Sequence, residues 1–336
     1  MVNCDGADFE RIPTIWETTI RVLHIKNSSL LIIQKGALKR YTDLEELIIE
    51  NCNRLHAIEK FAFKGLNHLK LLRLANNPSL TEIAKNAFSQ VSSRHGLRIQ
   101  LLNNSFSRIR QGLFRQLSRL REFTLEGQDL KIELNAFAGL TQVDFFNLFG
   151  VISFGLRPFE NVSRIHRLEI SRSHFSISHG IFAGISHVRE IHITGNDIET
   201  IGTAGFTGLY TVGCLTVNDN KIGNISRHAF SSIVNVGEIV IERNNIRHLE
   251  TEALLSQASR IGFRDNILYC SCVISWLKYI NDSVLLKENF CGAEEFYRSL
   301  SNYRPSCSRP KRGQSAAVAT RTHHFIATLC LFIVTF

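Results

Sequence analysis

The strongest constraint on the fold is a pattern that occurs twice in succession between Val188 and Val236, with a step of 24 residues. The first copy has apolar residues and one asparagine at Val188, Ile191, Ile193, Asn196, Ile198 and Ile201. The second copy has them at Val212, Leu215, Val217, Asn220, Ile222 and Ile225. One copy of this length cannot bury its own apolar face. Consecutive copies must therefore stack into an elongated solenoid.

Two features of each copy indicate how it folds. The fourth and sixth residues point to the same side of a short strand, because side chains alternate between the two faces of a strand. The ninth residue is an asparagine, whose amide can bond the backbone groups that a bend leaves unpaired. This arrangement, LxxLxLxxNxL, is typical of leucine-rich repeats. We therefore expect a right-handed α/β leucine-rich-repeat horseshoe of about ten and a half repeats.

The pattern extends over residues 20–265, with eleven repeat starts of which the last is a half repeat. The starts are Ile20, Leu44, Leu69, Gly96, Leu120, Val143, Ile165, Val188, Val212, Val236 and Ala258. The asparagine is present at Asn77, Asn104, Asn196, Asn220, Asn244 and Asn266. Its place is taken by Ser28, Cys52, Gln128, Val151 and Ser173. Three of these replacements are consecutive, so the middle repeats lack the bend amide, and their curvature or order can differ from that of the other repeats.

A second apolar column occurs late in each repeat. Its members are Phe63, Phe88, Phe114, Phe137, Phe159, Phe182, Phe206, Phe230 and Leu254. Stacked at the repeat spacing, these side chains predict an aromatic column beneath the convex side of the solenoid.

After the last asparagine, Asn266, come Cys270, Cys272, Cys291 and Cys307. The sequence alone allows three disulfide connectivities for four cysteines. A zinc site is the less favoured alternative, because no C-x-x-C pair is present. The segment resembles the cysteine-rich C-terminal cap of extracellular leucine-rich-repeat proteins. The resemblance covers essentially residues 3–307 and implies that Cys270 pairs with Cys291 and Cys272 with Cys307.

The two ends of the chain complete the expected organisation. Residues 1–19 resemble the end of a cysteine-rich N-terminal cap. Neither a signal peptide nor the earlier cysteines of such a cap precede Cys4, so we expect Met1 to lie inside a longer cap; the alternative is a truncated cap with a free Cys4. Residues 266–307 form the C-terminal cap, 308–324 a linker and 325–336 an apolar tail. The tail is too short to span a bilayer.

The small residues, polar spacer and apolar tail are typical of a GPI-attachment signal, with Gly313 or Ser315 as the attachment residue. A merely apolar C-terminus is the alternative. Secretion is also favoured by five glycosylation sequons. They begin at Asn27, Asn103, Asn161, Asn224 and Asn281.

The charge balance of +9, from 39 Lys and Arg against 30 Asp and Glu, permits acidic partners without identifying one. Several arginines fall between residues 94 and 121. We expect them to lie on a solvated convex face; a site for sulfated glycans or anionic lipid is the alternative. The arginines concerned are Arg94, Arg98, Arg108, Arg110, Arg115, Arg119 and Arg121.

The sequence contains no nucleophile elbow, phosphate-binding glycine loop or H-E-x-x-H motif. We therefore predict no enzymatic activity, no cofactor, no metal site and no nucleic-acid partner. The chain resembles GPI-anchored or secreted cell-surface proteins of the Nogo receptor, connectin and chaoptin type. That resemblance implies adhesion or receptor-type binding of a protein, either another cell-surface protein or a second copy. A matrix protein that binds collagen or sulfated glycans, and a cytosolic scaffold, are the alternatives.

Strand alternation predicts which side chains face the hollow of the horseshoe. Phe145 and Phe149 are notable because Phe146 and Leu148 already fill the inward places of the same strand. Outward aromatics flanked by charges are typical of protein-binding surfaces, with a solvated strand surface as the alternative. The predicted ligand-binding residues are Glu122, Glu126, Phe145, Asn147, Phe149, Arg167, Glu169, Glu190 and His192.

Overall fold

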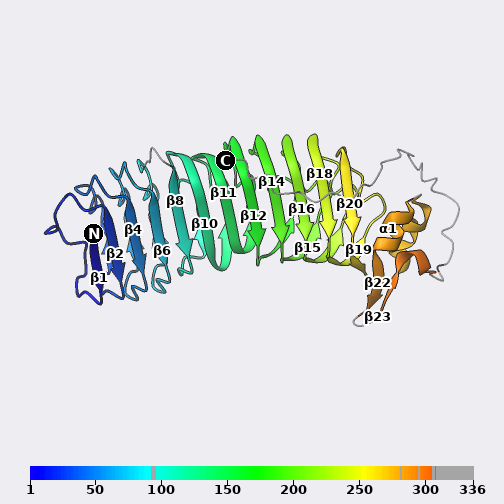
Figure 1. Cartoon of the computed structure of the whole chain (residues 1–336), viewed down its shortest axis with the longest axis horizontal. Coiled ribbons are helices and arrows are strands. Elements are labelled where there is room, and N and C mark those ends of the chain that lie inside the picture. Colours follow the sequence, from blue (N-terminus) through cyan, green and yellow to red (C-terminus); the bar gives the residue numbers. More distant parts are fainter. Residues whose placement is uncertain (92–95, 281, 294–295, 305–306, 308–336) are drawn as a thin grey trace.

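The computed structural model describes residues 1–91, 96–280, 282–293, 296–304 and 307. They form an elongated solenoid in which successive repeats lie side by side along the long axis (Figure 1). Its main sheet has 13 parallel strands, in sequence order apart from short β9 (Arg108–Ile109), which pairs with β10. The other strands are β1 (Val2–Asp5), β2 (Val22–Lys26), β4 (Glu46–Glu50), β6 (Leu71–Ala75), β8 (Leu97–Leu102), β10 (Leu117–Ile132), β11 (Leu140–Phe154), β12 (Arg164–Ser171), β14 (His187–Thr194), β16 (Thr211–Asn218), β18 (Asn235–Glu242) and β20 (Arg260–Arg264).

The other side of the repeats consists of turns and two narrower sheets. One contains β3 (Ile32–Ile33), β5 (Ala57–Ile58) and β7 (Glu82–Ile83). The second contains β13 (His174–Ile177), β15 (Asp197–Ile201), β17 (Lys221–Ile225), β19 (Asn245–Leu249), β21 (Ile267–Leu268), β22 (Phe290–Ala293) and β23 (Phe296–Ser299). Within the described ranges the one α-helix is α1 (Ser283–Glu288), in the C-terminal cap beside the 3₁₀ segments η1 (Cys272–Tyr279) and η2 (Leu300–Asn302). The predicted solenoid is confirmed, with a convex side of strands and turns.

The core lies between these two sides, as the alternation predicts. The fourth and sixth residues of the full repeats are completely buried, for example Leu47 with Ile49 and Leu215 with Val217. The eight phenylalanines of the predicted column are also completely buried, and neighbouring rings lie 5.2–6.5 Å apart, centroid to centroid. Stacked rings each contribute about 0.5–1.5 kcal/mol beyond the burial of their area. The column therefore ties each repeat to the next.

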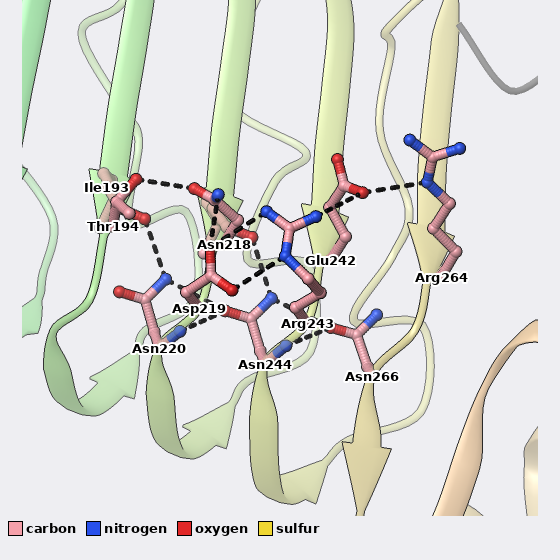
Figure 2. Close-up of polar contacts among 11 residues, drawn as sticks. Ile193, Thr194, Asn218, Asp219, Asn220, Glu242, Arg243, Asn244, Arg264 and Asn266 are labelled. Atoms are coloured by element: carbon pink, nitrogen blue, oxygen red, sulfur yellow. Dashed lines mark hydrogen bonds and ion pairs between the residues drawn. The ribbon is translucent and has the colours of Figure 1, made fainter. Parts of the chain in front are cut away.

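The asparagines that follow β14, β16, β18 and β20 form a continuous hydrogen-bond ladder along the bends of the C-terminal repeats (Figure 2). The Asn220 side chain accepts from the N–H and the Nδ2 of Asn196, at 2.9 and 3.1 Å. Its own Nδ2 donates to the carbonyl of Ile193 and to Oδ1 of Asn244. Both donors and both lone pairs of this buried amide are thus used, which is the condition for burying it without loss of stability.

The ladder continues through Asn244 and Asn266 to Asn289, a residue of the cap that the repeat pattern did not include. Asn289 ends the ladder by donating to the carbonyls of Phe263 and Leu285. It lies 23 residues after Asn266, close to the repeat spacing, and this was the signal available in the sequence.

The middle repeats are built differently. Strands β10 and β11 run on through the bend, over 16 and 15 residues. Register shifts follow Glu126, so that Leu130 pairs with Val151 and takes the inward place. Gln128 is exposed there, which corrects its assignment to the bend-amide position. Gln128 is displaced from the bend-amide position because the bulge adds residues to β10 after Glu126. Counting positions from the start of the repeat could not detect this bulge.

The C-terminal cap covers the last repeat. Cys270 is bonded to Cys291 and Cys272 to Cys307, which is the pairing that the resemblance implies. The Trp276 indole N–H donates to the carbonyl of Leu249, so this side chain lies against the repeats. At the other end β1 pairs with β2, and Cys4 is a free, half-buried thiol.

Candidate ligand-binding face

The register of the main sheet brings the predicted site residues together in three rows on its outward face, which we call the concave face. One row contains Glu122, Phe145, Arg167 and Glu190 on β10, β11, β12 and β14. The next contains Thr124, Asn147, Glu169 and His192, and the third Glu126, Phe149, Ser171 and Thr194. Neighbouring strands are about 4.8 Å apart. The nine predicted residues therefore form one continuous surface over four strands.

Phe145 is the exposed apolar residue at the centre of this surface. Its side chain is 42% exposed, because Phe146 and Leu148 already occupy the interior beneath β11. The ring lies 6.1 Å from that of His166, which is itself exposed on β12. An aromatic ring kept on a strand face among polar neighbours can lose further solvent when a partner binds.

Phe149 lies four residues further along β11 and is half-buried. The Arg172 guanidinium lies over its ring, 4.6 Å from the centroid, and reaches the Glu126 carboxylate with Nη1 to Oε1 at 3.1 Å. Arg172 adopts a left-handed backbone conformation with φ of 50° just after β12, which directs its side chain back across the face. Sequence reasoning missed Arg172 because it follows the strand and lies outside the alternating positions.

A chain of hydrogen bonds orders the polar residues on the N-terminal side of Phe145. The Gln100 amide donates to Glu122 Oε1 at 2.8 Å, and the Thr124 hydroxyl donates to the same oxygen at 3.0 Å. The Asn147 amide donates to the Thr124 hydroxyl at 3.1 Å. These side chains bond across strands, so Phe145 is bordered by an ordered polar surface.

On the other side of Phe145, Arg167 Nε lies 3.8 Å from Glu190 Oε2, and His192 Nε2 lies 3.4 Å from the same oxygen. Burial lowers the pKa of His192, and the Arg167 charge lowers it further. The hydrogen bond with Glu190 opposes both effects, and so do the charges of Glu190 and Glu169. With its pKa below the ordinary value, His192 is mainly neutral at pH 7.

Arg94 lies outside the described residues, and the other arginines predicted between residues 94 and 121 do not form one convex patch. Arg108 and Arg110 lie at the bend edge, with guanidinium nitrogens 3.7 and 3.9 Å from Glu133. Arg119 and Arg121 lie at the opposite edge, near the start of β10. The prediction of one convex group was wrong because the chain crosses the width of the sheet between Arg110 and Arg119, so arginines close in sequence lie at opposite edges.

The predicted sequons fall at different places. Asn27, Asn103 and Asn161 are exposed, and Asn103 lies just after β8, outside the surface around Phe145. Asn224 is half-buried, and its amide donates to Glu250 and Ser226. Asn281, the two predicted attachment residues Gly313 and Ser315, and the apolar tail lie outside the described residues. Among the residues that the structure describes, no helix is long and apolar enough to cross a membrane.

The stacked parallel strands, the bend ladder and the disulfide-bonded cap define a leucine-rich-repeat solenoid. Six copies of the BspA type leucine rich repeat region match residues 31–165 and 152–262. The chain therefore belongs to the leucine-rich-repeat family.

Podocan and Tsukushi are among the proteins whose sequences are similar to this chain. Podocan of Mus musculus is 24% identical over 208 residues, which cover 59% of this chain and 32% of Podocan. Tsukushi of Gallus gallus is 21% identical over 155 residues, 46% of this chain and 40% of Tsukushi. The chain thus spans less than half the length of these relatives.

A chain of the octameric complex of Latrophilin 3, Unc5D and FLRT2 has the same fold, with a TM-score of 0.53 and 18% identity. The match covers 84% of this chain and 86% of that chain. The likeness concerns the fold alone.

Proposed function

We propose that the chain is a non-catalytic protein-binding module of the extracellular space or cell surface. On this proposal it recognises its partner through the concave face of β10, β11, β12 and β14. The observation that carries the proposal is the exposed Phe145 ring among ordered charged and polar side chains. Aromatic anchors surrounded by a polar rim dominate the binding energy of protein interfaces.

The extracellular setting is supported by the two cap disulfides, since such bonds persist in oxidising compartments. Protein binding is supported by the octameric complex, whose FLRT2 part is a leucine-rich-repeat region assembled with other proteins. Adhesion or a receptor role is the specific form that we propose, with another cell-surface protein or a second copy of the chain as partner.

The test begins with the secreted, tagged protein, which is screened against an array of extracellular domains that includes itself. For the partner found, surface plasmon resonance measures Kd. Phe145→Ala and Phe149→Ala should each weaken binding at least about fivefold, which corresponds to roughly 1 kcal/mol.

The matched control is Phe296→Ala. Phe296 is 87% exposed on β23 of the cap, far along the chain from the candidate face. The same change of side chain there should leave Kd unaltered. Unchanged affinity in a well-secreted Phe145→Ala/Phe149→Ala double variant would place the binding site elsewhere.

A further inference from the structure

A row of basic side chains lies along the edge of the main sheet where β10, β12 and β14 begin. We call it the strand-start strip, and all its members are exposed. Its members are Arg119, Arg121, Arg164, His166, His187 and Arg189. They come from three separate repeats, so the sequence alone does not show that they lie close together.

The strand register aligns the strip. Arg119 is level with Gln142 on β11, which is level with Arg164 on β12 and then with His187 on β14. Arg121 lies two residues further along β10. At about 4.8 Å between neighbouring strands, the strip extends over roughly 15 Å. It ends at β16 and β18, where the neutral Thr211 and Asn235 take the corresponding places.

The guanidinium groups of this strip are available to a ligand. In the part of the chain that the structure describes, Arg119, Arg121 and Arg164 form no ion pair. Arg189 has Glu190 Oε1 at 3.7 Å, but its side chain is 58% exposed. The intervening position on β11 carries the exposed Asp144. The four arginines and the one aspartate together carry a net charge of +3.

We propose that the strand-start strip binds a sulfated glycosaminoglycan laid across the beginnings of these strands. Guanidinium groups donate paired hydrogen bonds to tetrahedral oxyanions, and Arg119, Arg121 and Arg164 form no ion pair among the described residues that would compete with such a ligand. Guanidinium groups on β10, β12 and β14, with Gln142 and Asp144 between them on β11, suit a linear polyanion whose sulfates are spaced along its length. The strip is limited to four strands, which fits a short length of glycan better than the plane of a bilayer.

The arginines of this strip are not part of the proposed protein-binding surface around Phe145, although the strip adjoins it, with the His166 ring 6.1 Å from that of Phe145. The arginines lie at the strand starts, whereas Phe145, Asn147 and Phe149 follow along β11. Loss of one site should therefore leave the other intact, and the two proposals can fail independently.

The test measures binding of the full secreted chain to immobilised heparin at about 0.15 M salt. The double variant Arg121→Gln/Arg164→Gln should bind about tenfold more weakly, because it loses two charge-assisted contacts. Arg108→Gln/Arg110→Gln is the matched control, since it removes the same charge at the opposite edge, near Glu133. The control should stay within about twofold of the unaltered protein.

Equal weakening in both double variants would show that only net charge matters and would overturn the site. Unchanged binding by Arg121→Gln/Arg164→Gln would overturn it as well. Thermal unfolding of each variant, expected to be unchanged for these exposed positions, separates loss of contacts from loss of fold.

Two further arms identify the ligand class. Desulfated heparin should not bind, and raising the salt to about 0.5 M should release sulfated heparin because exposed charges are then screened. Binding to vesicles of phosphatidylserine and phosphatidylcholine without binding to heparin would replace the glycan by a membrane surface and contradict the proposal. Phe145→Ala should bind heparin normally, which separates this result from the protein-binding proposal.

Discussion

The middle repeats and the C-terminal repeats are joined to their neighbours by different interactions at the bend. From β14 to the cap, buried asparagines pass a hydrogen bond from each bend to the next. In β10 and β11 the strands run through the bend instead. Among the described residues, the ladder of bend side chains stops at Asn104 and resumes where the Val151 N–H donates to the Ser173 hydroxyl.

The middle repeats have a more aromatic core in place of the ladder. Phe123 and Phe146 are stacked at 5.1 Å and meet the phenylalanine column edge-on, at 4.8 and 4.9 Å. The exposed Phe145 lies on these same strands. Aromatic packing therefore stabilises the region that lacks the bend amides, and this region also carries the exposed Phe145.

The largest expected effect concerns the bend of β11. Gly150 has a φ of 74°, and an added Cβ would lie 1.8 Å from the carbonyl oxygen of Gly127 in the neighbouring strand. Gly150→Ala should therefore destabilise the protein by more than about 3 kcal/mol or abolish secretion. Chemical unfolding and secretion yield measure this.

Gly195 provides the control from the other region. It also has a positive φ, 64°, but no atom lies within 4 Å of its added Cβ. Gly195→Ala should cost only the strain of a left-handed alanine, about 1–2 kcal/mol. If the two substitutions lowered the free energy of unfolding equally, the close approach of the Gly127 carbonyl oxygen to Gly150 would not be what requires glycine in the bend of β11.

The ladder predicts the second largest effect. Asn220→Ala leaves the Ile193 carbonyl and the Asn196 amide groups without their buried partner. Each of these three unsatisfied groups costs about 1–3 kcal/mol, so the free energy of unfolding should fall by at least about 3 kcal/mol. Gln128→Ala changes the residue at the same place of the repeat pattern. Because Gln128 is exposed, that change should stay within about 0.5 kcal/mol.

These two substitutions also mark what the sequence could and could not predict. Period and alternation were enough to predict the buried pairs, the phenylalanine column and the placement of Phe145 on the outward face. The repeat period and the alternation could not reveal the bulge after Glu126, because a bulge leaves the pattern of apolar residues on either side of it unchanged. The Arg172 contact with Phe149 depends on a backbone turn, and the strand-start strip depends on register between distant repeats. Neither property is local in the sequence.

A smaller effect concerns pH. Burial and the Arg167 charge lower the pKa of His192 in the folded protein below the ordinary 6.5, against the opposing Glu190 and Glu169. The folded state then binds fewer protons than the unfolded state. The stability contributed by this group is complete above pH 6.5 and is lost as the pH falls through the lowered pKa.

The free energy of unfolding should therefore decrease between pH 7.5 and 5.5, and less so in His192→Gln. Urea unfolding at both values tests this. Glu250, whose pKa is lowered by hydrogen bonds from the Arg227 backbone and Asn224, loses its contribution at more acidic pH and does not interfere. An identical pH dependence in the variant would contradict the assignment.

The central claim is that the partner covers the face of β10, β11, β12 and β14 and leaves the repeats of β16, β18 and β20 uncovered. Glu169→Asn tests it most directly, because an asparagine followed by Ile170 and Ser171 completes a glycosylation sequon in the middle of the candidate face. Gly262→Asn with Arg264→Thr places the same glycan on β20, about 20 Å further along the sheet. With glycan occupancy verified by mass, the partner should no longer bind the first variant and should bind the second normally. Normal binding to a fully glycosylated Glu169→Asn variant would contradict the account.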